Sequence, residues 1–358
     1  MKAWEAVCKA TGAPTLIVPA GKNFLLTPIT FGGFCSSNTI TVQVEGNIVA
    51  PSSLSQWPKF VGLSKWISFQ FVNGLIINGG GQINGQGSIW WNALVYTPNI
   101  NTLKKDNILQ AVHFNGCNNL QLSGLYSVNP PRNHITINNC KNVIISHINL
   151  NAPGNSPNTD GIDISGSSQI QIHDSNIATG DDCISIRGNS SLINITGITG
   201  GPCHGISVGS LGQNMQIYET VEQVYVGNST LTGTTNGVRI KTWQGGFGYA
   251  KNITFEHITC FRVGNPIIIN QSYKDNRKND ELESAVQISD VTYTNINGSS
   301  VSDQAITLNC SVSKPCTNIV MGQINLFSSV PGGKITSFCQ NTHGTSISTI
   351  PNVTCLSG

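Results

Sequence analysis

A five-residue pattern recurs through the middle of the chain. A polar residue and a small residue are followed by an apolar, a variable and a second apolar residue. The first copy spans residues 133–137, and its first position returns after 27, 22, 22, 32 and 29 residues. Such alternation is typical of a short β-strand with one buried face. The copies begin at Asn133, Asp160, Asp182, His204, Asn236 and Asn265. The pattern therefore predicts a series of strands that repeat one structural unit.

A second series of short apolar strands lies between these copies. Its members begin at Asn142, Gln169, Gln223 and Asn252. Each period of roughly 22 to 30 residues then holds two or three strands, and stacked coils of this kind share one apolar interior. We predict an all-β, parallel β-helix in which equivalent residues of neighbouring coils lie about 4.8 Å apart. The alternative is a β-propeller or a sandwich, and propeller blades repeat nearer about 40 residues.

The start of the chain differs from the repeats. Residues 4–9 have helical character, and Ala10 to Gly12 end the predicted helix. We expect residues 1–12 to form a partial cap on one end of a single domain over residues 1–358. Two polar segments, residues 104–107 and 274–280, are predicted to be a surface loop and a loop beside the binding cleft.

The composition supports the prediction of a β-rich fold. Glycine is abundant at 38 residues and only 10% of residues are charged, which disfavours long helices. The net charge of +2 and the pI of about 8.0, without a basic run, argue against a nucleic-acid partner. No apolar stretch is long enough to cross a membrane, so we expect no membrane partner either.

The cysteines point to an oxidising compartment. Eleven cysteines are heavy usage for a cytosolic protein, and the odd count leaves at least one without an intramolecular partner. Residues 1–7 lack the apolar segment of a signal peptide, so we expect an extracellular protein whose export signal is not in this sequence. Triplets for N-glycosylation begin at Asn189, Asn194, Asn228, Asn252, Asn270, Asn297, Asn309 and Asn352.

The repeat also gathers chemically active side chains. Asp160, Asp182 and His204 occupy the same position on three consecutive periods, with Asp181 beside Asp182. Arg239 and Lys241 fall on the following period. One face of the solenoid is therefore predicted to collect three carboxylates, an imidazole and two cations.

Strand geometry complicates that prediction. Regular alternation would point Asp181, Arg239 and Lys241 outward and Asp182 into the interior. Because Gly180 precedes the aspartate pair at a predicted turn, we expect alternation to fail there. For any one of these aspartates, the alternative is a structural role in a turn, since Asp at such positions often hydrogen-bonds its own backbone.

Metal binding and cofactors are not expected. No compact cluster of Cys and His ligands is visible in the sequence. His204 alone would more often be a structural histidine, and the other six histidines are interpreted as structural or surface residues.

Four motifs stand in order along the chain: Asn158-Thr159-Asp160, Gly180-Asp181-Asp182, Cys203-His204-Gly205 and Arg239-Ile240-Lys241. With these motifs the chain resembles the plant-type polygalacturonases of glycoside hydrolase family 28. Further matching segments are residues 85–91, 129–134 and 265–273, so the resemblance covers nearly the whole chain. It implies a right-handed parallel β-helix of the pectin-lyase-like kind.

The resemblance implies hydrolysis of the α-1,4 linkages of de-esterified pectin in the plant cell wall, with inversion of configuration. Asp181 is then the general acid, Asp160 and Asp182 hold and activate water, and His204 supports the acid. The substrate-binding residues it implies are Asn158, Arg239, Lys241 and Tyr273. Such a division of roles is physically coherent, because neighbouring like charges keep one carboxyl group protonated while others ionise.

The resemblance also implies disulfide bonds. The pairs are Cys183–Cys203, Cys310–Cys316 and Cys339–Cys355, and we also expect Cys8–Cys35. Cys117 and Cys140 are expected to stack as buried thiols on adjacent coils, while the pairing of Cys260 stays open.

Two other functions remain open at this point. A pectate lyase would need calcium-binding carboxylates and a basic residue for β-elimination, and the Gly-Asp-Asp and Arg-Ile-Lys motifs favour hydrolysis instead. An inactive wall-binding paralogue is disfavoured by the intact aspartates. We expect a monomer whose partner is polygalacturonate; endo or exo action, and a rhamnogalacturonan or xylogalacturonan substrate, are left undecided.

Overall fold

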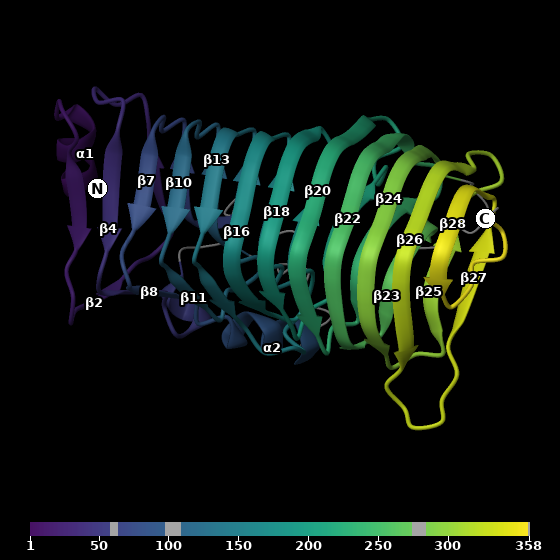
Figure 1. Ribbon diagram of the computed structural model, residues 1–358. Coiled ribbons are helices and arrows are strands. Elements are labelled where there is room, and N and C mark those ends of the chain that lie inside the picture. The colour runs from purple at the N-terminus through teal and green to yellow at the C-terminus, as the bar shows by residue number, and fades with distance from the viewer. Residues whose placement is uncertain (58–63, 97–108, 274–283, 357–358) are drawn as a thin grey trace. The chain divides into compact units, whose positions relative to one another are not determined.

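The computed structural model describes residues 1–57, 64–96, 109–273 and 284–356. These residues form two compact units, Met1–Asp181 and Asp182–Gly358. The strands of both units pair in parallel and follow the chain from coil to coil (Figure 1). The predicted loops at residues 104–107 and 274–280 lie outside the described residues.

In the unit Met1–Asp181, each coil supplies one strand to each of three parallel rows. The first row is β1–β4–β7–β10–β13–β16 and the second is β2–β5–β8–β11–β14, which also pairs with β16. The third row, β3–β6–β9–β12–β15, forms the other sheet. The elements are α1 (Lys2–Lys9), β1 (Thr15–Val18), β2 (Asn23–Leu25), β3 (Ile29–Gly32), β4 (Ile40–Val44), β5 (Asn47–Val49), η1 (Leu54–Gln56), β6 (Lys65–Gln70), β7 (Leu75–Asn78), β8 (Gln82–Asn84), α2 (Ser88–Tyr96), β9 (Gln110–Asn115), β10 (Leu120–Ser123), β11 (Tyr126–Val128), β12 (Ile135–Asn138), β13 (Lys141–Ser146), β14 (Asn149–Asn151), β15 (Ile162–Ser165) and β16 (Ser168–Ala178).

In the unit Asp182–Gly358, each coil supplies two strands, because the first two rows merge into one long strand. One sheet is β18–β20–β22–β24–β26–β28 and the other is β17–β19–β21–β23–β25–β27. The elements are β17 (Ile184–Ile186), β18 (Ser190–Gly200), β19 (Ile206–Leu211), β20 (Tyr218–Thr232), β21 (Asn236–Trp243), β22 (Phe247–Val263), β23 (Asn265–Tyr273), β24 (Ala285–Ser300), β25 (Gln304–Asn309), β26 (Cys316–Ser328), β27 (Thr336–Gln340) and β28 (Thr342–Ile350).

The observed register matches the sequence repeat within each unit. Ile135 pairs with Ile162, and Ile184 pairs with Ile206. The second series follows the same rule, because Val143 pairs with Ile170. The apolar residues of the pattern are buried, as expected for a face that lines the interior of stacked coils. The all-β parallel β-helix predicted from the sequence is therefore confirmed.

Polar residues in left-handed backbone conformation mark one corner of successive coils. Asn119, Asn142 and Gln169 are equivalent by register and have φ of 55°, 58° and 58°. Asn142 Nδ2 donates a 2.7 Å hydrogen bond to Asn119 Oδ1 on the neighbouring coil. Asn tolerates this conformation and its amide can donate and accept, which explains why turns of this chain are rich in Asn.

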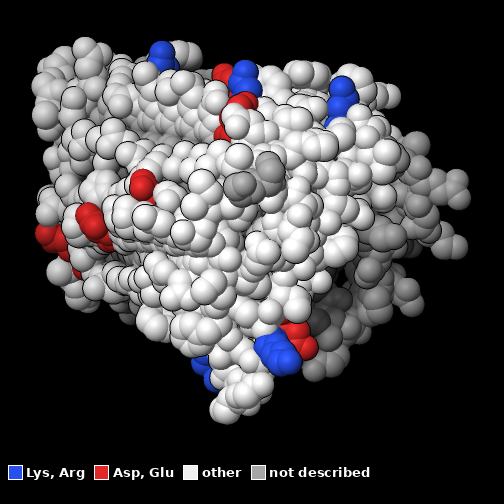
Figure 2. All heavy atoms as spheres, turned by 45° about the vertical axis from the view of Figure 1, so that its right-hand side comes forward, with Lys and Arg blue, Asp and Glu red and all other residues white. Residues whose placement is uncertain are grey.

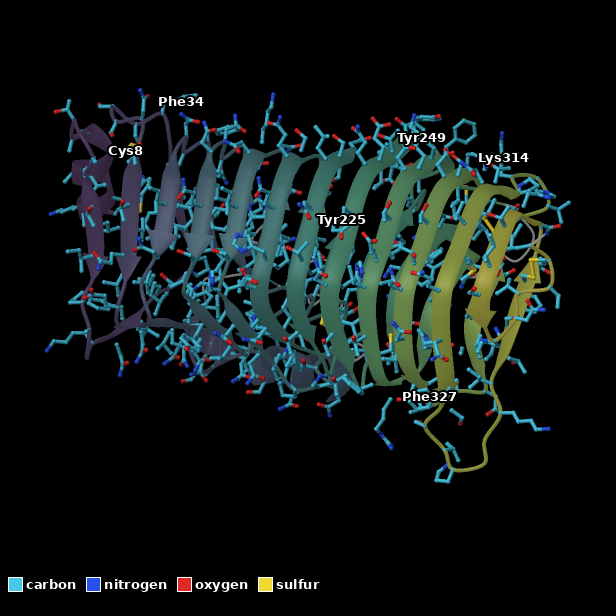
Figure 3. All side chains as sticks on the ribbon, in the orientation of Figure 1. Cys8, Phe34, Tyr225, Tyr249, Lys314 and Phe327 are labelled. Atoms are coloured by element: carbon cyan, nitrogen blue, oxygen red, sulfur yellow. A yellow bond between two sulfur atoms is a disulfide. The ribbon has the colours of Figure 1, made fainter. Side chains whose placement is uncertain are left out.

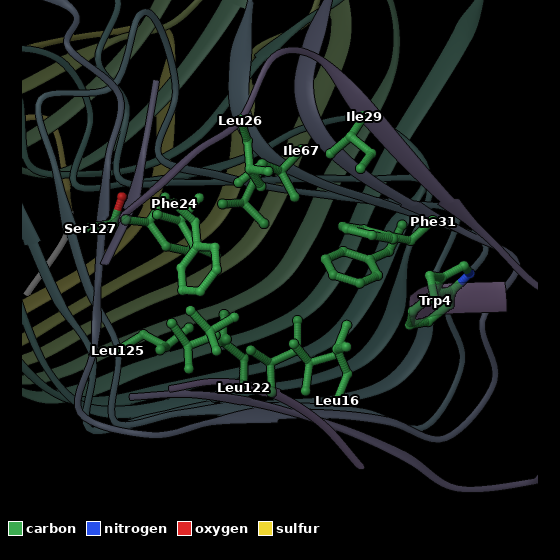
Figure 4. Close-up of a pocket in the computed structure, with 18 of the residues that line it drawn as sticks. Trp4, Leu16, Phe24, Leu26, Ile29, Phe31, Ile67, Leu122, Leu125 and Ser127 are labelled. Atoms are coloured by element: carbon green, nitrogen blue, oxygen red, sulfur yellow. The ribbon is translucent and has the colours of Figure 1, made fainter. Parts of the chain in front are cut away.

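The predicted N-terminal helix is present and carries an aromatic anchor. Trp4 of α1 is 3% exposed, and its ring lies 5.1 Å from Phe31 and 5.9 Å from Phe69. Beneath the helix is an apolar cavity of about 370 Å³ lined by side chains of the first coils (Figure 4). The interior of this unit is thus less completely filled near α1 than a close-packed core would be.

All four expected disulfide bonds are present: Cys8–Cys35, Cys183–Cys203, Cys310–Cys316 and Cys339–Cys355. Cys117, Cys140 and Cys260 are buried free thiols. The backbone N–H of Cys117 lies 3.3 Å from Cys140 Sγ, so these two cysteines stack on adjacent coils as predicted. Among the residues that the structure describes, no helix is long and apolar enough to span a membrane.

Candidate active site

The unit Met1–Asp181 holds two of the three aspartates on neighbouring turns. Asp160 lies just before β15 and is 5% exposed, whereas Asp181 follows β16 in a bend and is half-buried. The main-chain carbonyl of Asp160 accepts a 2.8 Å hydrogen bond from the N–H of His134. Asn158, on the same turn as Asp160, is half-buried and has a left-handed φ of 56°.

A threonine pair joins these two turns. Thr179 Oγ1 donates to the main-chain carbonyl of Thr159, and the two side-chain oxygens are 2.9 Å apart. Thr159 Oγ1 also accepts a 3.0 Å hydrogen bond from the N–H of Gly180. Both threonines are fully buried, so the network ties the turn of Asp160 to the turn of Asp181.

Gly180 is held against the first of these turns. A Cβ atom at this position would lie 2.0 Å from the carbonyl oxygen of Ser156. Any larger residue would therefore push apart the two backbone segments that carry Asp160 and Asp181.

The unit Asp182–Gly358 holds Asp182 in a cage of donors. The carboxylate is 1% exposed. Its Oδ1 accepts a 2.5 Å hydrogen bond from Arg239 Nη2 and one of 2.9 Å from Ser207 Oγ. Its Oδ2 accepts a 2.7 Å hydrogen bond from Lys241 Nζ. A buried carboxylate needs this kind of charge and hydrogen-bond compensation.

The position of Asp182 settles the question of alternation. Ser207 and Arg239 pair in register and alternate with the buried Ile206 and Val238, so they point away from the apolar interior. Because Asp182 bonds both residues, its side chain lies on that outer face as well. Gly180 and Asp181 form a bend rather than part of β17, as expected, and regular alternation does not apply there.

His204 lies close to Asp182. A ring nitrogen of His204 and a carboxylate oxygen of Asp182 are within 4.8 Å of each other. The Cys183–Cys203 disulfide joins the residues next to them, with a Cα–Cα distance of 5.5 Å. The disulfide therefore fixes the segment before β17 against the segment before β19.

Tyr273 borders the cations. Lys241 Nζ lies 5.3 Å from the centre of the Tyr273 ring, and Trp243 meets that ring edge-on at 5.4 Å. In this unit the structure thus brings together Asp182, His204, Arg239, Lys241 and Tyr273. On the face that Figure 2 shows, charged side chains are sparse and scattered.

Sequence reasoning missed the polar residues that hold the site. Ser207 Oγ accepts a hydrogen bond from Arg239 Nε and donates one to Asp182, and Thr159 with Thr179 joins two turns. The sequence held a signal for Ser207 only, because Ser207 is the variable position of a repeat copy. It also missed a cluster outside these motifs, since His147, His173 and Asp174 lie together on the surface of Met1–Asp181.

Comparison with known proteins identifies the family. Residues 8–351 match glycosyl hydrolases family 28. A probable polygalacturonase of Arabidopsis thaliana is 46% identical over 99% of this chain and 76% of that protein. A polygalacturonase of Persea americana is 44% identical over 95% of this chain and 72% of that protein.

A solved structure supports the fold. The crystal structure of endo-xylogalacturonan hydrolase from Aspergillus tubingensis superimposes with a TM-score of 0.78 at 24% identity, covering 92% of this chain and 88% of that one. The chain belongs to glycosyl hydrolases family 28 and is a glycoside hydrolase.

Proposed function

We propose that this chain is a polygalacturonase that hydrolyses the α-1,4 linkages of de-esterified pectin with inversion of configuration. The observation that carries the proposal is the buried Asp182 carboxylate held by Arg239, Lys241 and Ser207 in a family 28 chain. The relatives named polygalacturonases, which share 44 to 46% identity with this chain, support the same substrate.

The proposed reaction is a single displacement at the anomeric carbon. Asp181 donates its proton to the glycosidic oxygen as the bond between that oxygen and the anomeric carbon breaks. Water attacks the anomeric carbon from the opposite side and gives a proton to the carboxylate pair of Asp160 and Asp182. General acid and base groups on opposite sides of the sugar are the arrangement of inverting glycosidases.

The cations suit a galacturonate carboxylate. Arg239 and Lys241 contribute two positive charges against the one negative charge of Asp182, so the cluster keeps a net charge of about +1. Arg239 uses its Nε and one Nη2 donor on Ser207 and Asp182, and Lys241 uses one of three ammonium donors on Asp182. The remaining N–H groups of both side chains are the donors proposed for the substrate carboxylate.

Three other residues have proposed supporting roles. His204 keeps the general acid supplied with its proton, Asn158 hydrogen-bonds the sugar, and Tyr273 packs against it. An aromatic ring beside a cation offers an apolar face to a sugar ring and a charge to its carboxylate.

We propose that residues 1–358 act as one catalytic domain, a monomer that works outside the cell in the plant cell wall. The four disulfide bonds support an oxidising compartment.

A reducing-sugar assay on polygalacturonate tests the proposal. We expect new reducing ends without the ultraviolet absorption that an unsaturated sugar would give. Absorbing products would mean elimination by a lyase, and no products would mean an inactive paralogue. Chromatography of the oligogalacturonides over time then separates endo from exo action.

A further inference from the structure

His147, His173 and Asp174 form a cluster of metal-ligand side chains on the surface of Met1–Asp181. Each offers one ring nitrogen or carboxylate oxygen, and these three atoms all lie within 4.8 Å of one another. His147 directly follows β13 and the other two belong to β16, whereas Asp160 precedes a strand of the other sheet. We propose that this cluster is a zinc-binding site that joins two neighbouring coils.

The backbone holds the three residues in a fixed frame. Ser146 pairs with His173, so His147 and Asp174 are equivalent positions of adjacent coils. Both have a left-handed backbone, with φ of 52° and 51°, and the N–H of His147 donates a 3.3 Å hydrogen bond to the carbonyl of His173.

Side chains next to the cluster strengthen this frame. The N–H of Ile148 donates to Ser175 Oγ at 3.3 Å, and Asn176 Nδ2 donates to Asn149 Oδ1 at 3.0 Å. Both bonds connect the same two coils. A site on rigid strands with supporting hydrogen bonds loses little freedom when it binds a metal ion.

The type and spacing of the donors favour zinc. His173 Nδ1 and Asp174 Oδ2 are 2.8 Å apart, and the rings of His147 and His173 are 5.8 Å apart at 85°. Two imidazoles and a carboxylate are zinc ligands, whereas calcium and magnesium prefer all-oxygen sites. Zinc ligands in a tetrahedron lie roughly 3.4 Å apart. His173 Nδ1 and Asp174 Oδ2 therefore need to separate slightly, and donors as far apart as 4.8 Å need to approach.

The side chains have room to make that adjustment. His147 and Asp174 are exposed and His173 is half-buried, so rotation of their rings and carboxylate meets no packed core. Three protein ligands leave a fourth position for water. Because the ligands come from two coils, zinc binding would stabilise the folded chain against the unfolded one.

The test is zinc titration by calorimetry on the intact chain, with His147→Ala and His173→Ala as the variants. His257→Ala is the matched control, because His257 is also exposed, has a left-handed φ of 53°, and lies 3.6 Å from the carboxylate of Glu256. Circular dichroism checks that each variant is folded, and the activity of His147→Ala on polygalacturonate should equal that of the wild type.

We expect the wild type and His257→Ala to bind the same number of zinc ions, and the two cluster variants to bind one fewer per chain. Any zinc held by Asp182 and His204 is common to all four proteins and cancels in this difference. Zinc should also raise the melting temperature of the wild type more than that of His147→Ala. Equal zinc counts in all four proteins, or an equal loss in His257→Ala, would overturn the proposal.

Discussion

Asp182 shows how neighbouring side chains can hold a single carboxylate in place. Its oxygens accept hydrogen bonds from Ser207, Arg239 and Lys241. The side chain is therefore oriented by protein donors. The role that we propose for it, as a base in a displacement by water, requires such a fixed orientation.

Asp181→Asn tests the proposed general acid. The amide cannot donate a proton to the glycosidic oxygen, so turnover of polygalacturonate should fall by about 10²- to 10⁴-fold. Asp181 is only half-buried, and we expect the fold to survive, as circular dichroism would check. The exposed Asp303 gives a control in Asp303→Asn, which should keep full activity. Turnover near the wild-type level in folded Asp181→Asn would refute the assignment.

Lys241→Gln tests the charge contact with the substrate. Glutamine still offers a donor to Asp182 but lacks the positive charge, so KM for de-esterified pectin should rise by about tenfold or more. The rise should be smaller for methyl-esterified pectin, whose carboxyl groups carry no charge.

Lys251→Gln is the matched control for this experiment. Lys251 also pairs with a carboxylate, that of Glu222 at 3.2 Å, and lies 4.5 Å from the ring centre of Tyr249, which Figure 3 labels on the outer side of the sheet. This variant should leave both KM values unchanged. Equal rises on the two substrates in Lys241→Gln would show that charge is not the basis of binding.

At the scale of elements, buried hydroxyl groups position the acidic turns. Thr159 and Thr179 connect the turn of Asp160 to the turn of Asp181, and Gly180 allows the close approach of the two backbones. The positions of Asp160 and Asp181 within this unit therefore depend on residues for which we propose no chemical role.

Gly180→Ala should break this arrangement. The added methyl group would meet the carbonyl of Ser156 at 2.0 Å, so one backbone segment must move. We expect a loss of about 1 to 3 kcal/mol in unfolding free energy and a fall in kcat of at least about tenfold. Gly80→Ala is the control, because no atom lies within 4 Å of a Cβ at Gly80. Urea unfolding and initial rates measure both effects, and full activity in Gly180→Ala would contradict them.

The repeat made most of the fold predictable from sequence. The pairings Ile135–Ile162 and Ile206–Val238 follow directly from the spacing of the pattern, because stacked coils keep equivalent residues in register. The orientation of Asp182 was harder, since it depends on a bend whose side-chain direction the strand pattern does not determine. The cluster of His147 with His173 was missed because it depends on how a residue in the turn after one strand aligns with the neighbouring coil.

At the scale of the whole molecule, two buried histidines link stability to pH. Burial lowers the pKa of His134 to about 3, and burial together with the charge of Lys65 lowers the pKa of His113 to about 4. Unfolded histidine titrates near about 6.5, so below that pH the unfolded state binds more protons than the folded state. Stability should therefore fall as the pH falls from 6.5 towards 4.

The expected loss between pH 7 and pH 4.5 is about 2 to 3 kcal/mol for each of these histidines. Urea unfolding at the two pH values measures it. His113→Gln should reduce the loss of unfolding free energy by the part that His113 contributes. His257→Gln, at an exposed position, should leave the loss as in the wild type. An undiminished loss in His113→Gln would show that His113 titrates normally in the folded chain.

A single displacement by water is the central step of the proposed reaction. If Asp181 protonates the leaving oxygen while Asp160 and Asp182 activate water on the opposite face, an α-linked substrate must first release a β-configured reducing end. Proton NMR of oligogalacturonide hydrolysis during the earliest turnovers can detect this anomer before mutarotation mixes the two forms. We predict the β-anomer first. An initial α-anomer would mean a covalent intermediate, and it would contradict the roles proposed for all three aspartates.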